Sequence, residues 1–281
     1  MKLVITLLCL ALLTCTDTAN LGEGAGAKLS SATPPPNPAP AASQNALTPE
    51  PTWPDSLAGL PIATYLTGQF DPANNPTFKR VPSQYTDGRA HLLHEETLAA
   101  FKKMHAAAAQ NGISLTIVSA TRNFDRQRQI WEAKWRGDRL LEGRDNATTI
   151  YPDPADRARA ILRYSSMPGT SRHHWGTDLD LNALTNGYFA SGEGKRTYDW
   201  LAANGPTYGF CQPYTAKGSE RPEGYEEEKW HWSYTPLASQ LTDFAAAELR
   251  NAAIGGFAGA EAAGAIDVVG NYVLGVNRAC R

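Results

Sequence analysis

Two short segments, far apart in the chain, place the strongest constraint on the fold. Residues 171–180 read SRHHWGTDLD and residues 228–231 read EKWH, so together they hold imidazoles and carboxylates. A catalytic zinc site needs three protein ligands, an open position for water and a base beside that water. The chain can supply this set only if its fold brings the two segments together. The expected metal ligands are His173, Asp180 and His231.

The spacing in the first segment indicates how its side chains could face one site. If Gly176–Leu181 is extended, Asp178, Asp180 and Asn182 share one face of the strand, because side chains alternate along a strand. His173 then lies on the loop that precedes the strand and can fold back toward that face. The glycine at the start of the strand allows the chain to turn and pass close to the site.

Glu228 is expected to act as the catalytic base. It lies three residues before His231, and on a regular strand that offset would place the two side chains on opposite faces. We therefore expect a bulge or turn over residues 228–230. With that bend, the carboxylate can stand beside the catalytic water and accept its proton without binding the metal.

Two neighbouring residues leave the ligand set open. His174 adjoins His173 and could replace it, although a supporting or substrate-facing role is the alternative that we favour. Asp178 could likewise replace Asp180. The remaining histidines are interpreted as structural or surface groups: His91, His94 and His105.

Hydrophobic periodicity predicts a mixed α+β fold. Helices are expected over residues 93–111, 124–136, 154–164 and 197–203, and over the Ala-rich stretch 237–268 with a break at Gly255–Gly256. Strands are expected over residues 113–119, 176–181 and 230–234, while residues 271–276 are expected to form a small strand or a loop. Strands and helices do not alternate regularly, which argues against a doubly wound parallel sheet.

The N-terminal part has the composition of an export signal followed by a linker. Residues 1–20 contain one lysine and a short apolar run, which indicates a signal peptide or, with Cys15 as the modified residue, a lipoprotein signal. Residues 21–56 are rich in Pro and Ala and are expected to be disordered; eight of the 19 prolines lie between Pro34 and Pro54. A catalytic domain is expected over 57–240, with an Ala/Gly-rich extension over 241–281 packed on it.

The charge and the cysteines indicate which ligands and which cellular compartment suit the protein. The net charge is −2, and we find no basic run, so nucleic-acid binding is not expected. If the signal is removed, Cys211 and Cys280 remain. In an exported protein these two can form a disulfide, and two separate buried thiols are the alternative.

The motifs resemble those of the zinc D-alanyl-D-alanine carboxypeptidases, in the lysostaphin/D-Ala-D-Ala/sonic hedgehog superfamily. The resemblance lies in Ser171-x-His173-x-x-Gly176-x-x-x-Asp180 and in Glu228-x-Trp230-His231. Upstream, residues 119–127 read SATRNFDRQ, similar to a substrate-binding Ser-x-x-Arg-(x)4-Gln segment. The family usually has a small residue where Asp178 stands.

The resemblance implies a small antiparallel sheet flanked by helices, with Zn²⁺ at His173, Asp180 and His231 and with Glu228 as base. It further implies that a substrate's terminal carboxylate is bound by Arg122, with two more residues in the same pocket, Gln127 and Ser171. A guanidinium can meet a carboxylate with two parallel hydrogen bonds, which favours a free C-terminus over mid-chain peptide. The alternative is that Arg122 pairs with an internal acid.

The expected function is zinc-dependent removal of the C-terminal D-alanine from peptidoglycan stem peptides, as a D,D- or L,D-carboxypeptidase. Two alternatives are an endopeptidase that cuts peptidoglycan crosslinks and a non-catalytic, zinc-containing binding module of the cell envelope. The protein is expected to be an exported monomer of the periplasm or cell envelope, either soluble or tethered to the membrane by an N-terminal lipid.

Overall fold

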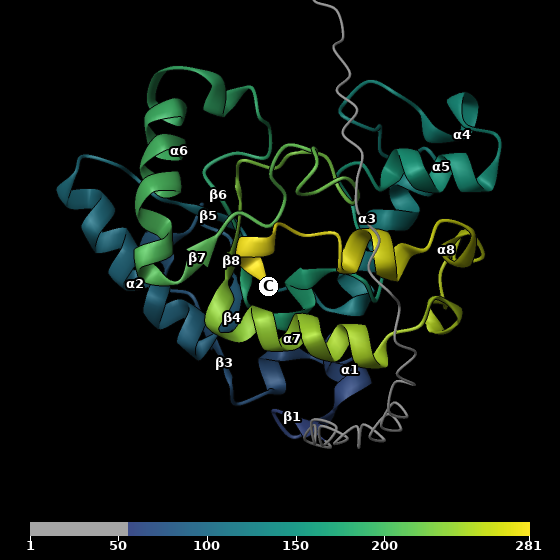
Figure 1. Cartoon of the computed structure of the whole chain (residues 1–281), viewed down its shortest axis with the longest axis horizontal. Coiled ribbons are helices and arrows are strands. Elements are labelled where there is room, and N and C mark those ends of the chain that lie inside the picture. Colours follow the sequence, from purple (N-terminus) through teal and green to yellow (C-terminus); the bar gives the residue numbers. More distant parts are fainter. Residues whose placement is uncertain (1–55) are drawn as a thin grey trace, which may run out of the picture. The chain divides into compact units, whose positions relative to one another are not determined.

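A four-stranded antiparallel sheet lies at the centre of the structure, a computed structural model that describes residues 56–281 (Figure 1). Its strands are β5 (Ile117–Ser119), β6 (Asp178–Leu181), β8 (His231–Tyr234) and β7 (Phe210–Cys211), in the order β5-β6-β8-β7. Two small hairpins precede it, β1 (Ser56–Leu57) with β2 (Leu60–Pro61) and β3 (Phe78–Arg80) with β4 (Leu92–His94). The predicted α+β class with a small antiparallel sheet is confirmed. The predicted signal (1–20) and nearly all of the linker (21–56) lie outside the described residues.

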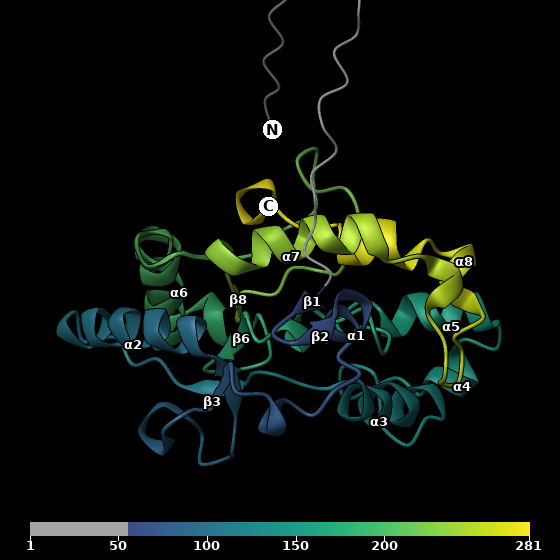
Figure 2. The same ribbon diagram turned by 90° about the horizontal axis from the view of Figure 1, so that it is seen from below.

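Helices flank the sheet on both sides. Figures 1 and 2 show α2 and α6 on one side, α3, α5 and α8 on the other, and α7 running between them. The helices are α1 (Ile62–Leu66), α2 (Glu95–Gln110), α3 (Phe124–Trp135), α4 (Ala147–Ile150), α5 (Pro154–Ile161), α6 (Gly192–Asn204), α7 (Thr235–Glu248) and α8 (Ala262–Ala265).

The helices with clear local signals lie where the sequence predicts them. Asn123 caps α3, because its side chain accepts a hydrogen bond from the backbone N–H of Arg126 at 2.9 Å. Asp153 caps α5 in the same way, accepting from Ala155 and Asp156. Because such caps satisfy backbone donors that have no partner inside the helix, they determine where a helix begins.

Several predicted elements differ in extent from the observed ones. The Ala-rich helix expected over 237–268 ends at Glu248 as α7, well before the expected break at Gly255–Gly256, and only the short α8 follows within that range as an α-helix. Helix α6 begins at Gly192 rather than at residue 197, because glycine obscures its first turn in the sequence. Gly194 is needed there, since a Cβ would lie 2.0 Å from the Tyr188 carbonyl oxygen. The strand expected over 113–119 is reduced to β5, and residues 269–273 form one π-helical turn rather than a strand.

Two groups of buried side chains form the core. One lies between α2, α6 and the sheet and includes Phe101, Met104, Leu179, Leu181 and Trp232. Leu179 and Leu181 therefore face away from the expected metal site, as alternation predicts.

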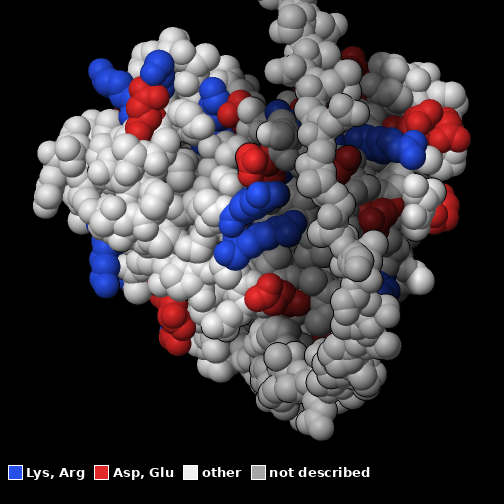
Figure 3. Space-filling view, viewed as in Figure 1, with Lys and Arg blue, Asp and Glu red and all other residues white. Residues whose placement is uncertain are grey.

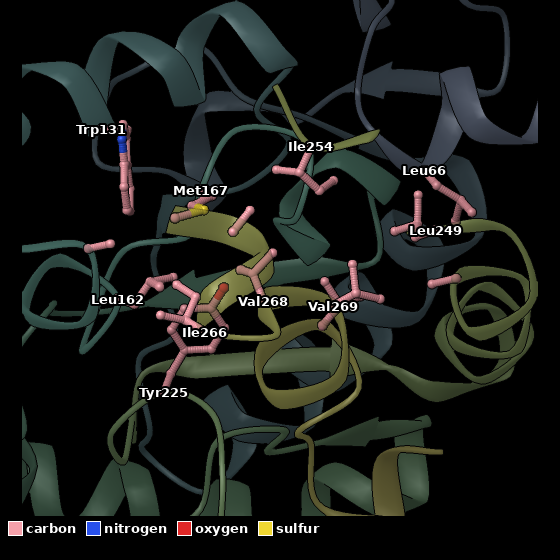
Figure 4. Close-up of a cluster of buried hydrophobic side chains, with 14 of the residues drawn as sticks. Leu66, Trp131, Leu162, Met167, Tyr225, Leu249, Ile254, Ile266, Val268 and Val269 are labelled. Carbon is pink, nitrogen blue, oxygen red and sulfur yellow. The ribbon is translucent and has the colours of Figure 1, made fainter. Parts of the chain in front are cut away.

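The other group joins α3, α5, α7 and the C-terminal segments (Figure 4). It includes Trp131, which is fully buried, together with Met167, Ile254, Val268 and Val269. Residues beyond 240 thus supply part of the main core, and the expected boundary at 240 falls inside α7. The two remaining cysteines, Cys211 and Cys280, form a disulfide that ties the C-terminal end to β7.

Charged side chains on the face shown in Figure 3 lie in small groups of both signs. This distribution agrees with the near-zero net charge of −2. No helix within residues 56–281 has the length and apolar character needed to cross a bilayer.

Candidate metal centre and cleft

The sheet brings the two sequence segments together. Asp180 on the central strand β6 lies directly opposite His231 on β8 in the antiparallel register. His173 lies on a short 3₁₀ helix (Arg172–Trp175) just before β6. Gly176, at φ 75°, turns the chain between that helix and the strand, and a Cβ there would lie 2.5 Å from the Phe78 ring. Glycine is therefore required where the chain returns to the sheet.

Three ligand atoms converge on one point. One atom from each of His173, Asp180 and His231 lies within 4.8 Å of the other two. All three residues are almost completely buried. This spacing suits a single divalent ion, and two imidazoles with one carboxylate form a donor set that zinc accepts.

The hydrogen bonds of the two imidazoles indicate which nitrogens face that point. Nδ1 of His173 lies 2.8 Å from the Ala120 carbonyl oxygen, so this nitrogen must donate and Nε2 keeps its lone pair. That Nε2 lies 3.4 Å from Oδ2 of Asp180. On the other ring, Nε2 of His231 lies 2.8 Å from Oδ2 of Asp178, and Nδ1 lies 3.2 Å from Oδ1 of Asp180.

These contacts fit a cation better than a set of hydrogen bonds. When Nε2 of His231 donates to Asp178, the Nδ1 lone pair points toward Asp180. Oδ1 of Asp180 is buried and has no hydrogen-bond partner of acceptable geometry. Lone pairs from three side chains therefore face one another, which is an arrangement that a bound Zn²⁺ would stabilise.

Asp178 lies in the shell around the ligands rather than among them. Besides His231, its carboxylate accepts hydrogen bonds from the hydroxyls of Thr177 and Ser233, each at 2.7 Å, and from Nε of Arg172 at 3.1 Å. Burial alone would raise its pKa, but Arg172 and His231 outweigh burial and hold the pKa well below its usual range. The geometry therefore favours Asp180 over Asp178 as the ligand.

Arg172 is a site residue that the sequence analysis missed. Its guanidinium is buried, donates to Thr242 at 2.8 Å and to Ser233 at 2.9 Å, and lies 4.7 Å from the Trp175 ring centroid. The signal in the sequence that could have revealed the role of Arg172 is Asp178. An aspartate in a buried strand needs a counterion, and an arginine stands six residues before it.

Glu228 reaches the same point from a turn. The backbone N–H of His231 donates to the Glu228 carbonyl at 3.3 Å, which confirms the expected turn. Oε2 of Glu228 then lies 3.1 Å from Nδ1 of His231. Burial raises the pKa of Glu228, and a carboxylate with a raised pKa is a better proton acceptor near neutral pH.

Arg122 lies between the metal site and α3 and is held through its backbone. Its N–H donates to the His173 carbonyl at 3.1 Å, and its own carbonyl lies 2.6 Å from Nδ1 of His174. Nε2 of His174 in turn accepts from the Gly169 N–H at 3.1 Å. Both nitrogens of His174 are thus occupied, so the geometry favours a positioning role for this residue over metal binding.

The Arg122 side chain has no counterion in the described part of the chain. No carboxylate of residues 56–281 lies within 4 Å of its guanidinium, and its buried Nε has no hydrogen-bond partner. Burial lowers its pKa despite the attraction of Asp180 and Glu228. An unpaired guanidinium next to the metal site is available to bind an anion.

One cavity of about 1000 Å³ connects these groups. It is lined by Arg122, by Gln127, by Glu228 and by the three expected metal ligands His173, Asp180 and His231, which we call the metal triad. Gln127 donates to the Ser166 carbonyl at 2.7 Å, and its Oε1 has no partner. Ser171 is buried, its hydroxyl has no hydrogen-bond partner, and it is not among the residues that line the cavity. The cavity also has a lysine that sequence reasoning missed, Lys134.

One family model and several curated proteins match the chain. Residues 90–237 match the family model "VanY: D-alanyl-D-alanine carboxypeptidase". The chain is 30% identical over 146 residues to YodJ of Bacillus subtilis, covering 50% of this chain and 46% of that protein. It is 25% identical over 162 residues to a D-alanyl-D-alanine carboxypeptidase of Enterococcus faecalis, covering 56% and 55%. The chain thus spans about half the length of the curated relatives it matches.

Solved structures also resemble the chain. The LD-carboxypeptidase LdcB has a TM-score of 0.44 and 23% identity, over 59% of this chain and 70% of that one. The vancomycin-resistance D,D-pentapeptidase VanY, solved in complex with Zn(II), has a TM-score of 0.41 and 23% identity, over 59% and 93%.

Proposed function

Because the chain belongs to the D-alanyl-D-alanine carboxypeptidase family, we propose that it is a zinc-dependent carboxypeptidase that removes the C-terminal D-alanine from peptidoglycan stem peptides. The observation on which this rests is the convergence of the metal triad, Glu228 and an unpaired Arg122 on one cavity. A metal site kept only for structure would need neither the free carboxylate nor the free guanidinium.

Each residue has a defined task in this reaction. Zn²⁺ held by the triad would lower the pKa of water and polarise the scissile carbonyl. Glu228 accepts the proton of the attacking water and delivers it to the leaving amine, for which its raised pKa is suited. Arg122 binds the terminal carboxylate through charge-assisted hydrogen bonds, each worth about 1.5–3 kcal/mol. His174 and the carbonyl of His173 fix the backbone from which this guanidinium projects.

Glu228→Ala tests the assignment of the base. We expect hydrolysis of a pentapeptide stem to fall by at least about 100-fold, the lower range for losing general-base catalysis. Zinc content should stay at one ion per chain, because Glu228 is not a ligand. Glu227→Ala, on the same segment, is the matched control and should keep full activity. Full activity in Glu228→Ala would refute the mechanism.

A panel of stem peptides distinguishes D,D-carboxypeptidase, L,D-carboxypeptidase, endopeptidase and binding-module functions. Product masses from a pentapeptide and from a tetrapeptide stem distinguish D,D- from L,D-cleavage. Converting the C-terminal carboxylate into an amide should abolish cleavage by a carboxypeptidase that uses Arg122, whereas a crosslink endopeptidase would cleave both forms equally. A correctly folded, zinc-loaded protein that turns over no peptide of the panel would favour a binding module.

We further propose that the protein is exported and works as a monomer in the periplasm or cell envelope. The Cys211–Cys280 disulfide supports this location, because such bonds persist in oxidising compartments. The mass of the mature N-terminus distinguishes cleavage of a signal peptide from lipid attachment at Cys15. Light scattering of the purified protein tests the oligomeric state.

A further inference from the structure

Helix α3 presents a stripe of side chains to the catalytic cavity. Gln127, Ile130 and Lys134 recur at three- and four-residue steps, and all three line the cavity. Gln127 follows Arg122 closely in the chain, whereas Lys134 lies two helical turns further along. The stripe therefore places Gln127 and Lys134 along a wall of the same cavity that Arg122 lines.

Lys134 is a partly buried cation that no acid compensates. Its Nζ donates to the Ser165 hydroxyl, and no carboxylate of the described residues lies within 4 Å of it. Its pKa is lowered to about 8, mainly by burial and to a smaller extent by Arg139 and Arg122. Charging this group therefore opposes folding. A side chain that costs stability and lines an active-site cavity is a candidate for a role in function.

The charge balance of the cavity supports such a role. Six lining residues are cationic, namely Arg89, Arg122, Arg126, Lys134, Arg139 and Arg144. Three are acidic, namely Glu142, Asp180 and Glu228. Glu142 is paired with Arg163 at 2.8 Å and with Arg144 at 3.5 Å, and Arg89 is paired with Asp87. The other two acids belong to the metal site. Among the described residues, four of the six cations therefore have no ion pair, namely Arg122, Arg126, Lys134 and Arg139. The cavity thus has an excess of positive charge that attracts anionic ligands.

We propose that Lys134 forms a second anion subsite beside Arg122, and that the preferred substrate is a peptide with a further carboxylate upstream of the terminal one. This inference rests on the proposed carboxypeptidase function, because it assumes that Arg122 binds the peptide's C-terminus. The position of the scissile bond specifies only the C-terminal end of the substrate. The proposed subsite also specifies a carboxylate upstream of that end.

The geometry limits where the second carboxylate can lie. Lys134 lies seven residues after Gln127, which is about 10 Å along the helix axis at a rise of about 1.5 Å per residue. An extended peptide covers about 3.3–3.6 Å per residue, and the lysine side chain shortens the gap. The carboxylate should therefore lie about two to four residues from the C-terminus. Stem peptides with a free carboxylate on a diaminopimelate or on the γ-linked D-glutamate meet this condition, whereas amidated stems do not.

The test compares two pentapeptide stems that end in D-alanyl-D-alanine and differ only in whether the upstream carboxylates are free or amidated. KM and kcat are measured for the wild type, Lys134→Met and Lys134→Arg. Lys103→Met, on the exposed face of α2 and outside the cavity, removes the same charge and serves as the control. Stems amidated at one position then identify which carboxylate is recognised.

We expect the wild type and Lys103→Met to bind the free stem at least about tenfold better, as the loss of a charge-assisted hydrogen bond predicts. Lys134→Met should lose this preference through a raised KM for the free stem, and Lys134→Arg should keep it. Lys134→Met should also unfold at a higher temperature, because a costly buried charge is gone. An equal loss on both stems, or a less stable Lys134→Met, would overturn the proposal.

Binding measured by calorimetry separates this proposal from the one on which it rests. If the wild type hydrolyses neither stem but still binds the free one better through Lys134, the carboxypeptidase assignment fails and the subsite stands. If hydrolysis proceeds and neither affinity nor KM depends on Lys134, the subsite is refuted and the carboxypeptidase assignment stands.

Discussion

The buried pair of Asp178 and Arg172 offers the sharpest test of the metal-site geometry. Asp178→Ala leaves the guanidinium buried without its counterion, and breaking a buried ion pair costs about 3–5 kcal/mol. The same substitution removes the acceptor 2.8 Å from Nε2 of His231. Loss of such a partner typically lowers metal affinity about 10–100-fold. Asp178→Ala should therefore lower both the stability of the metal-free protein and its zinc affinity.

The double variant Asp178→Ala/Arg172→Met separates these two effects. It removes both charges, so the metal-free protein should regain most of the lost unfolding free energy. Zinc affinity should remain low, because nothing then fixes the tautomer and orientation of His231. Urea unfolding of the chelator-treated protein measures the first quantity, and competition with a chromophoric chelator measures the second.

An exposed ion pair provides the control for the charge change. Lys195 and Asp199 lie four residues apart on α6 with a contact of 2.6 Å, and both are more than half exposed. Replacing both should change stability by less than about 1 kcal/mol and leave zinc affinity unchanged. Wild-type zinc affinity in the Asp178/Arg172 double variant would refute the view that Asp178 positions His231.

The remaining predictions concern stability. Replacing Cys211 and Cys280 by serine opens a loop of 69 residues and should lower the unfolding free energy by about 4 kcal/mol, measured in urea without reductant; an unchanged midpoint would contradict it. Burial lowers the pKa of His174 to about 3, and the Gly169 N–H that donates to its Nε2 leaves no room for a second proton. Because the unfolded chain protonates first, stability should fall as pH drops from about 6.5 toward 3, by about 3 kcal/mol at pH 4.5. Unfolding free energies at pH 7 and 4.5 should show a smaller drop in His174→Gln, and an equal drop in both proteins would contradict the assignment.

The sequence alone determined the features that local chemistry controls. The identities and spacing of His173, Asp180, Glu228 and His231 were sufficient to predict a shared site. The start of α3 was equally predictable, because Asn123 is a local cap and needs no distant partner.

Only the tertiary structure decided what each side chain faces. Asn182 was expected on the metal-site face, but it has a φ of 63° and bonds to the backbone of Ser114 and Thr116 instead. Asp178 and Lys134 carry charges whose roles depend on which residues the fold packs around them. The physical reason is the distance along the chain over which each interaction acts. Caps, turns and periodicity act over a few residues, whereas counterions, tautomers and burial are set by residues that meet only after the chain has folded.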